Sequence, residues 1–162
     1  MGKLVSLPAL ARIRTRLRRQ GKRVVFTNGT FDILHRGHVE YLAAARKMGD
    51  ILIVGLNNDA SIRRIKGPAR PINRAPDRAA VLAGLASVDY IALFGGDTPY
   101  RMIARLLPDV LVKGADWKKA AIVGGDIVRD HGGSVRTVRL TPGRSTTNVI
   151  ARVLRAYAGR GS

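Results

Sequence analysis

The sequence predicts one α/β domain: a Rossmann-like, doubly wound parallel sheet of five strands with helices on both faces. The first reason is that five short apolar runs alternate with segments of helical periodicity, which is typical of a parallel sheet with crossover helices. The second is the length of 162 residues, which suits one domain with a buried core. The third is that polar residues follow the strands, where ligands bind in such sheets.

The individual elements follow from the apolar pattern and the turn residues. A helix is expected over 7–20, since Leu10, Ile13 and Leu17 form an apolar stripe and Gly21 ends it. The apolar runs predict strands at 23–28, 51–56, 89–94, 109–113 and 134–140. The segments between and after them predict helices at 37–48, 59–65, 77–87, 98–107, 118–130 and 146–157. The stretch 66–76, rich in proline and arginine, predicts a basic loop.

The chain shows no internal repeat and no linker. We expect residues 1–22 to form a basic helical extension and residues 23–158 to form the main domain. No apolar run reaches about 18 residues, so we expect no membrane span. The absence of cysteine excludes disulfides and thiolate metal sites, and no secretory signal is apparent. We therefore expect a cytoplasmic protein.

The net charge is strongly positive. The chain has 29 Lys and Arg against 11 Asp and Glu, a formal charge of +18. Such a field attracts polyanions, which include nucleic acids, anionic membranes and phosphorylated metabolites. The excess of arginine and the single glutamate, Glu40, are also typical of a GC-rich genome. Since no RNA-binding or zinc-finger signature is present, we do not expect a nucleic-acid partner.

Two histidines, His35 and His38, flank Gly37 where a helix is expected to begin. A helix N-terminus favours phosphate, and imidazoles add donors that can follow moving charge. Gly37, like Gly29 after the first strand, would let a nucleotide approach the backbone. The alternatives are an incidental cap or a metal pair, although metal pairs on helices prefer other spacings. The chain contains neither a P-loop nor a G-x-G-x-x-G motif, so the histidine motif is the leading phosphate site.

A second phosphate site is predicted at the start of the last helix. Ser145 is a candidate N-cap, Thr146 and Thr147 add hydroxyls in the first turn, and Arg144 adds charge. Simple helix capping is the alternative interpretation. The basic loop contributes Lys66, which is suited to the β- and γ-phosphates.

Other candidates surround these two sites. Arg70 and Arg78 could bind the phosphate of an acceptor, because arginine matches phosphate bidentately. Asn57 and Asp59 follow the second strand and are candidates for binding the same substrate. The candidates near the nucleotide base are Lys113, Gly114 and Asp116. Asp32 could orient the motif or help to place Mg²⁺, and we expect the structural role.

The H-x-G-H arrangement resembles the signature of the nucleotidyltransferase superfamily. The stretches "RPINRAPDRAAVLAGLASVDY" (70–90), "DTPYRMIARLLPDVLVKGADW" (97–117) and "STTNVI" (145–150) resemble D-glycero-D-manno-heptose 1-phosphate adenylyltransferases, and the resemblance covers 23–154. It implies transfer of AMP from ATP, with Mg²⁺, to the sugar 1-phosphate, giving ADP-heptose and pyrophosphate. The departures are Ala115 and Trp117, where that family more usually reads "KGGDY", together with the arginine-rich first helix and the charge.

The resemblance also assigns residues and partners. The triphosphate would be bound by His35, His38, Lys66, Ser145, Thr146 and Thr147. The nucleotide would be met mainly through backbone atoms by Thr27, Asn28, Gly29, Thr30 and Phe31. A homodimer and a separate sugar kinase are further expectations, and no protein ligand to a metal is expected.

Two alternatives remain open from the residues alone. A cytidylyltransferase acting on glycerol 3-phosphate or a similar small phosphate would share every phosphate motif. A basic nucleic-acid-binding module, using the cluster at 12–23, is the alternative from a different class.

Overall fold

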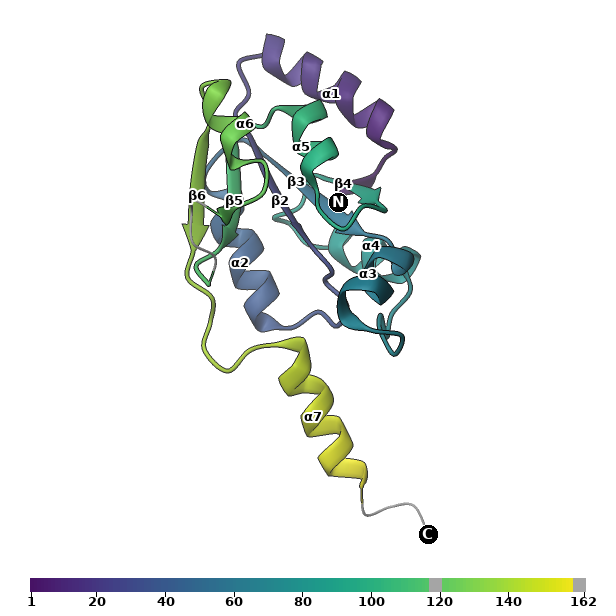
Figure 1. Ribbon diagram of the computed structural model, residues 1–162. Helices are drawn as coiled ribbons and strands as arrows, with labels where there is room; N and C mark the ends of the chain where they lie inside the picture. Colours follow the sequence, from purple (N-terminus) through teal and green to yellow (C-terminus); the bar gives the residue numbers. More distant parts are fainter. Residues whose placement is uncertain (117–120, 159–162) are drawn as a thin grey trace.

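The computed structural model describes residues 1–116 and 121–158. A parallel six-stranded sheet forms the centre of the domain, in the order β1-β4-β3-β2-β5-β6. The strands are β1 (Lys3–Leu4), β2 (Val24–Gly29), β3 (Ile51–Asn57), β4 (Tyr90–Phe94), β5 (Val110–Gly114) and β6 (Ser134–Val138). The described helices are α1 (Leu7–Arg19), α2 (Arg36–Arg46), α3 (Asp59–Lys66), α4 (Ala75–Ala83), α5 (Tyr100–Leu106), α6 (Gly125–Asp130) and α7 (Thr146–Tyr157). This arrangement confirms the predicted doubly wound α/β class (Figure 1).

Two apolar cores cover the two faces of the sheet. On one face, Leu42 of α2 and Leu82 of α4 pack with Leu52 and Val54 of β3. The residues of the other core come from α1, α5, α6 and the opposite sides of the same strands. The alternation of side chains along β2 explains this division, because Val25 faces the first core while Val24 and Phe26 face the second.

The N-terminal segment differs from the expected extension. Residues Lys3–Leu4 form β1 beside β4, giving six strands rather than the five predicted. A two-residue strand carries no period-two pattern, so the sequence could not reveal it. The following helix α1 buries Leu10 and Leu17 in the second core. Residues 1–22 therefore supply an edge strand and a covering helix to the domain.

Several boundaries also differ from the prediction. Helix α4 begins at Ala75 and ends at Ala83, so the expected helix over 77–87 is shifted and shorter. Lys66 ends α3 instead of opening the basic loop, because Gly67 caps that helix at φ 92°. Of the helix expected over 118–130, the structure shows α6 at Gly125–Asp130, while residues 121–124 form no α-helix and residues 118–120 lie outside the described part of the chain.

Helix α7 projects away from the body of the domain, and the N-terminal end of the helix lies nearest to that body (Figure 1). None of its residues is buried. Its exposed apolar side chains include Val153 and Leu154, which are 52% and 65% exposed. No described helix has the length and apolar character needed to cross a membrane.

Candidate active site

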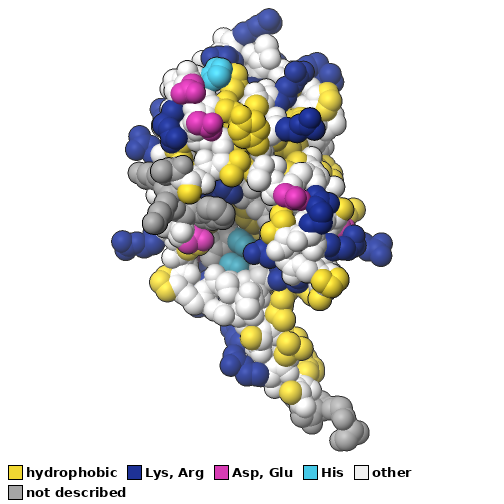
Figure 2. All heavy atoms as spheres, viewed as in Figure 1, with side chains coloured by type: hydrophobic (Ala, Val, Ile, Leu, Met, Phe, Trp, Pro, Cys, Tyr) yellow, Lys and Arg dark blue, Asp and Glu magenta, His cyan; other side chains and the backbone are white. Residues whose placement is uncertain are grey.

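A cleft of about 390 Å³ lies beyond the carboxyl ends of β2 and β5, the position at which doubly wound sheets bind ligands. Its walls come from β2, the start of α2, the end of α3, the end of β5 and the segment that leads into α7. It is lined by Asn28, Gly29, Thr30, Phe31, His35, Gly37, His38, Tyr41, Lys66, Lys113, Gly114, Asp116, Leu140, Thr141, Arg144, Ser145 and Thr146. Figure 2 shows the hollow above α7, with histidine side chains inside it.

The two histidines lie at the beginning of α2. His35 is the N-cap residue, and its side chain makes no capping hydrogen bond. The His35 and His38 rings stack with centroids 3.8 Å apart, and the Phe31 ring meets His38 edge-on at 5.1 Å. Both Nδ1 atoms are buried without a partner among the described residues. The rings are held by packing and, for His38, by a hydrogen bond to the Ile33 backbone, at the first turn of the helix.

Burial sets the protonation state of the pair. It lowers the pKa of His38 to about 4, with the charge of His35 acting in the same direction and a hydrogen bond to the Ile33 backbone opposing both. Burial also lowers the pKa of His35, assisted by Arg144. Both imidazoles are thus mostly neutral near pH 7. A neutral imidazole can donate one N–H to a phosphate without bringing a desolvated cation.

Glycines 29 and 37 make room for side chains of the site itself. A Cβ atom on Gly29 would lie 2.9 Å from the Phe31 ring. Phe31 adopts a φ of 42°, in the left-handed region that is costly for a residue with a Cβ. A Cβ atom on Gly37 would lie 3.1 Å from Cβ of Arg144 and 3.2 Å from the His35 ring. These glycines were predicted to clear space for the nucleotide. In the structure, side-chain atoms of Phe31, His35 and Arg144 lie close to the positions that their Cβ atoms would take.

The N-terminus of α7 forms the opposite wall of the cleft. The Ser145 side chain accepts a hydrogen bond from the Asn148 backbone N–H at 3.1 Å, which confirms the predicted N-cap. Asn148 Nδ2 donates to the Gly143 carbonyl at 3.1 Å and tightens the turn before the helix. Ser145 and Thr146 line the cleft, while Thr147 is exposed on α7 and does not. Two helix N-termini, those of α2 and α7, therefore meet at one cleft.

A single glutamate joins these two walls. Glu40, on α2, accepts a hydrogen bond from the Thr141 hydroxyl. It also forms an ion pair with Arg36, whose Nε lies 2.6 Å from the carboxylate. These contacts hold the pKa of Glu40 below its ordinary value, with the Thr141 bond the largest cause. Sequence reasoning missed Glu40, Thr141 and the neighbouring Leu140, because residues 101 positions apart carry no local signal.

Lysines supply positive charge at the cleft. Lys66 is exposed at the end of α3 and lines the opening. Burial lowers the pKa of Lys113 to about 8, although Asp116 raises it, and its ammonium lies 3.5 Å from the Asn28 carbonyl. Lys113 therefore remains mostly protonated near pH 7. Asp116 is the one carboxylate among the described lining residues, and those parts of the chain hold no group of three or more potential metal ligands.

Thr27 and Tyr41 support the cleft from below. Thr27 was predicted to bind nucleotide, but it is fully buried and its hydroxyl lies 2.7 Å from the Tyr41 hydroxyl. Tyr41 also donates to the Val112 carbonyl at 3.2 Å and lines the cleft. Burial raises its pKa to about 12, so the hydroxyl remains a donor. Tyr41 was missed because a tyrosine on the apolar face of a helix has the pattern of a core residue.

The four predicted acceptor-binding residues lie away from the cleft wall: Asn57, Asp59, Arg70 and Arg78. The Arg78 guanidinium has no exposed surface and donates to the carbonyls of Asn73, Thr30 and Asn57 and to Asp59, at 2.7–2.9 Å. It ties three loops together beneath the site instead of facing a ligand. Asn57 donates to Ser61 Oγ at 2.9 Å and is likewise buried.

Arg70 is occupied by Asp32. Its Nε donates to that carboxylate at 2.6 Å, and the backbone N–H groups of Ile72 and Asn73 donate to it as well. Burial would raise the pKa of Asp32, but the two backbone bonds and Arg70 together lower it. The role expected of Asp32 was to orient the histidine motif, whereas in the structure its carboxylate fixes the basic loop. The ion pair with Asp32 also occupies Arg70, which was predicted to bind phosphate.

Two helix N-termini at the carboxyl edge of a parallel sheet define a nucleotide-phosphate-binding α/β domain. Residues 26–152 match the cytidylyltransferase-like family, and the chain belongs to that family.

Curated relatives are similar over most of this chain. It is 54% identical over 140 residues to the bifunctional protein HldE of Syntrophotalea carbinolica, a match covering 86% of this chain and 29% of that protein. The bifunctional protein HldE of Campylobacter concisus is 58% identical over 132 residues, covering 82% and 27% respectively. The chain therefore spans less than a third of the length of these relatives.

Solved structures share the fold. A lipopolysaccharide core biosynthesis protein from Thermoplasma volcanium has a TM-score of 0.62 and 31% identity, covering 75% of this chain and 98% of that chain. A pantoate-beta-alanine ligase from Francisella tularensis has a TM-score of 0.61 at 15% identity, covering 96% of this chain and 80% of that chain. The second likeness concerns the fold alone.

Proposed function

We propose that this chain transfers AMP from ATP to D-glycero-D-manno-heptose 1-phosphate, releasing pyrophosphate and forming ADP-heptose. The observation that carries the proposal is the meeting of two helix N-termini, with His35 and His38 on one side and Ser145 and Thr146 on the other. Such an arrangement suits a triphosphate, which needs donors on both sides.

The chemistry requires positioning more than proton transfer. An ionised sugar phosphate oxygen attacks the α-phosphorus in line, its bond to that phosphorus forms, and the bond to the pyrophosphate oxygen breaks. Because the nucleophile is already anionic, no general base is needed, and the residues supply charge and donors to the equatorial and departing oxygens. His35 and His38 would donate to oxygens near the α-phosphorus, while Lys66 and the α7 N-terminus would bind the departing pyrophosphate.

Mg²⁺ completes the proposed site. Since Asp116 is the one carboxylate among the described lining residues, we propose that the ion arrives bound to the triphosphate. It would neutralise charge on the phosphate oxygens, which is its usual contribution to phosphoryl and nucleotidyl transfer.

The choice of substrates rests on the resemblance at 70–117 and 145–150 and on the similarity to the HldE proteins. The crossed assay is pyrophosphate release with ATP or CTP and with heptose 1-phosphate or glycerol 3-phosphate. We expect turnover with ATP and the heptose phosphate. Turnover with CTP alone would overturn the adenylyl assignment in favour of a cytidylyltransferase. Absence of turnover in all four combinations would overturn the enzyme assignment.

We also propose a homodimer, a separate kinase that supplies the sugar phosphate, and a cytoplasmic location. The exposed apolar side chains of Val153 and Leu154 on α7 support the dimer, because such side chains are suited to pack against a second copy.

The contact between Glu40 and Thr141 should tune nucleotide binding. Thr141→Val removes the hydroxyl that ties the segment before α7 to α2, so we expect KM for ATP to rise about two- to fivefold with a smaller change in kcat. Trypsin should also cleave faster after Arg139 and Arg144. Arg36→Ala is the matched control, because it breaks only the ion pair on the other side of Glu40. An unchanged KM and an unchanged cleavage rate would contradict this role.

A further inference from the structure

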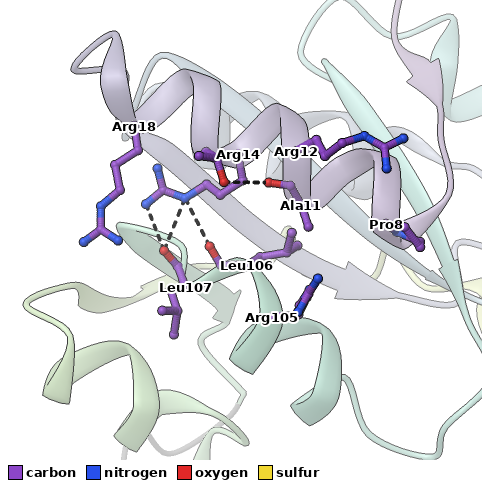
Figure 3. Close-up of a pocket in the computed structure, with 9 residues that line it drawn as sticks. Pro8, Ala11, Arg12, Arg14, Arg18, Arg105, Leu106 and Leu107 are labelled. Atoms are coloured by element: carbon purple, nitrogen blue, oxygen red, sulfur yellow. Dashed lines mark hydrogen bonds between the residues drawn. The ribbon is translucent and has the colours of Figure 1, made fainter.

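A second cavity lies between α1 and the C-terminal end of α5, and it shares no lining residue with the active-site cleft. Its volume is about 470 Å³, and Figure 3 shows Arg12, Arg14 and Arg18 on α1 and Arg105 on α5. No acidic side chain occurs among the described residues that line it. We call this cavity the arginine groove.

One of the four arginines has a structural task. The Arg14 side chain is only 6% exposed, and it donates to the Leu106 carbonyl at 3.1 Å and the Leu107 carbonyl at 2.9 Å. It therefore caps the negative end of α5. Its charge is balanced by Asp109 at 2.9 Å, and Asp109 in turn accepts from the Val24 backbone N–H at 2.7 Å.

The other three arginines are not balanced in this way. Arg12, Arg18 and Arg105 are exposed, and none of them forms an ion pair with an acid in the part of the chain that the structure describes. Arg18 also borders a neighbouring hollow together with Lys22 and Arg23. The positive potential of these groups therefore adds within a concave surface, which concentrates anions more than a flat charged face does.

We propose that the arginine groove is a second binding site, separate from the cleft, for a small phosphorylated anion. Guanidinium groups bind phosphate oxygens in pairs, and a cavity of this volume is within the range of small-ligand sites. The described lining residues include no aromatic side chain on which a nucleic-acid base could stack. A compact phosphate ligand is therefore favoured over a nucleic-acid strand.

The test is calorimetric titration with inorganic pyrophosphate near physiological salt. We expect two sites in the unmodified protein, one in the groove and one in the cleft. The groove variant carries Arg12→Gln, Arg18→Gln and Arg105→Gln, and it should lose one site, with binding there weakened about tenfold or more. The cleft variant, His35→Ala with Lys66→Ala, should lose the other site and keep the groove site. The melting temperature of the groove variant should not change, since its three side chains are exposed.

The matched control carries the same change in charge elsewhere, as Arg63→Gln, Arg136→Gln and Arg152→Gln. These three arginines are exposed and line neither cavity. We expect the control to retain both sites. Equal weakening in the control and the groove variant would overturn the proposal, because general charge would then explain the binding. Tight binding of duplex RNA that displaces pyrophosphate from the groove would overturn it in favour of a nucleic-acid site. A single site lost only in the cleft variant would overturn the groove while leaving the proposed function intact.

Discussion

Replacing His38 by alanine is expected to lower kcat by about 10²–10³, the usual effect of losing one donor to transition-state charge. His38 stacks on His35 and lines the cleft at the start of α2, the helix N-terminus that would bind phosphate. KM for ATP should change less than kcat, because the lost interaction strengthens as charge develops. Steady-state pyrophosphate release measures both constants.

His131→Ala is the matched control for that experiment. His131 is exposed beyond α6 and lines no part of the cleft. Its Nδ1 lies 2.9 Å from the Ile127 carbonyl oxygen. Its replacement should leave kcat unchanged. Full activity of the His38→Ala enzyme, with an unchanged melting temperature, would show that the histidine pair is not part of the chemistry.

Replacing Arg78 by alanine should destabilise the fold by roughly 3–5 kcal/mol, because it removes a fully buried side chain and leaves the partly buried Asp59 carboxylate and three carbonyls without their donor. For a chain of this size the melting temperature should fall on the order of 10 °C. Thermal unfolding followed by circular dichroism measures the change. Arg78→Lys should recover part of the stability, since its ammonium keeps the charge but reaches fewer acceptors.

A ligand-binding role for Arg78 would give a different combination of KM and melting temperature. If this arginine bound the acceptor phosphate, Arg78→Ala would raise KM for the sugar phosphate at an unchanged melting temperature. Arg74→Ala provides the comparison, since Arg74 is exposed at the start of the same helix and makes no side-chain cap bond. It should change neither quantity.

The phosphate-binding ends of the site were predictable because their signals are local. His35, Gly37 and His38 lie within one turn of α2, and Ser145 caps α7 three residues before the N–H it accepts. Helix starts leave N–H groups unpaired wherever they occur, so a motif at such a start already implies an anion site. The alternation of strands and helices likewise depends on short-range periodicity, and it was recovered apart from β1 and some boundaries.

The roles of arginines were poorly predicted, because sequence does not show what lies opposite a side chain. Arg70 and Arg78 follow the pattern of phosphate ligands, yet each faces an acid or carbonyls brought there by distant segments. Arg14 belongs to the arginine-rich first helix, yet its side chain is only 6% exposed and lies beneath the α5 C-terminus. Long side chains can reach inward or outward from the same position, so burial decides their function.

The sequence by itself determined the fold class, the position of the histidine motif at 35–38 at a helix start and the cap of the last helix, since each depends on residues within one turn or strand. The tertiary structure alone decided which charges remain available for a ligand. In the folded chain, Arg78, Arg70 and Arg14 have structural roles. Glu40 bonds to Thr141 across the cleft. Three other arginines line a second cavity: Arg12, Arg18 and Arg105. The physical reason is that a charge in a folded chain is satisfied by whatever the topology places beside it, at separations in sequence that no local pattern records.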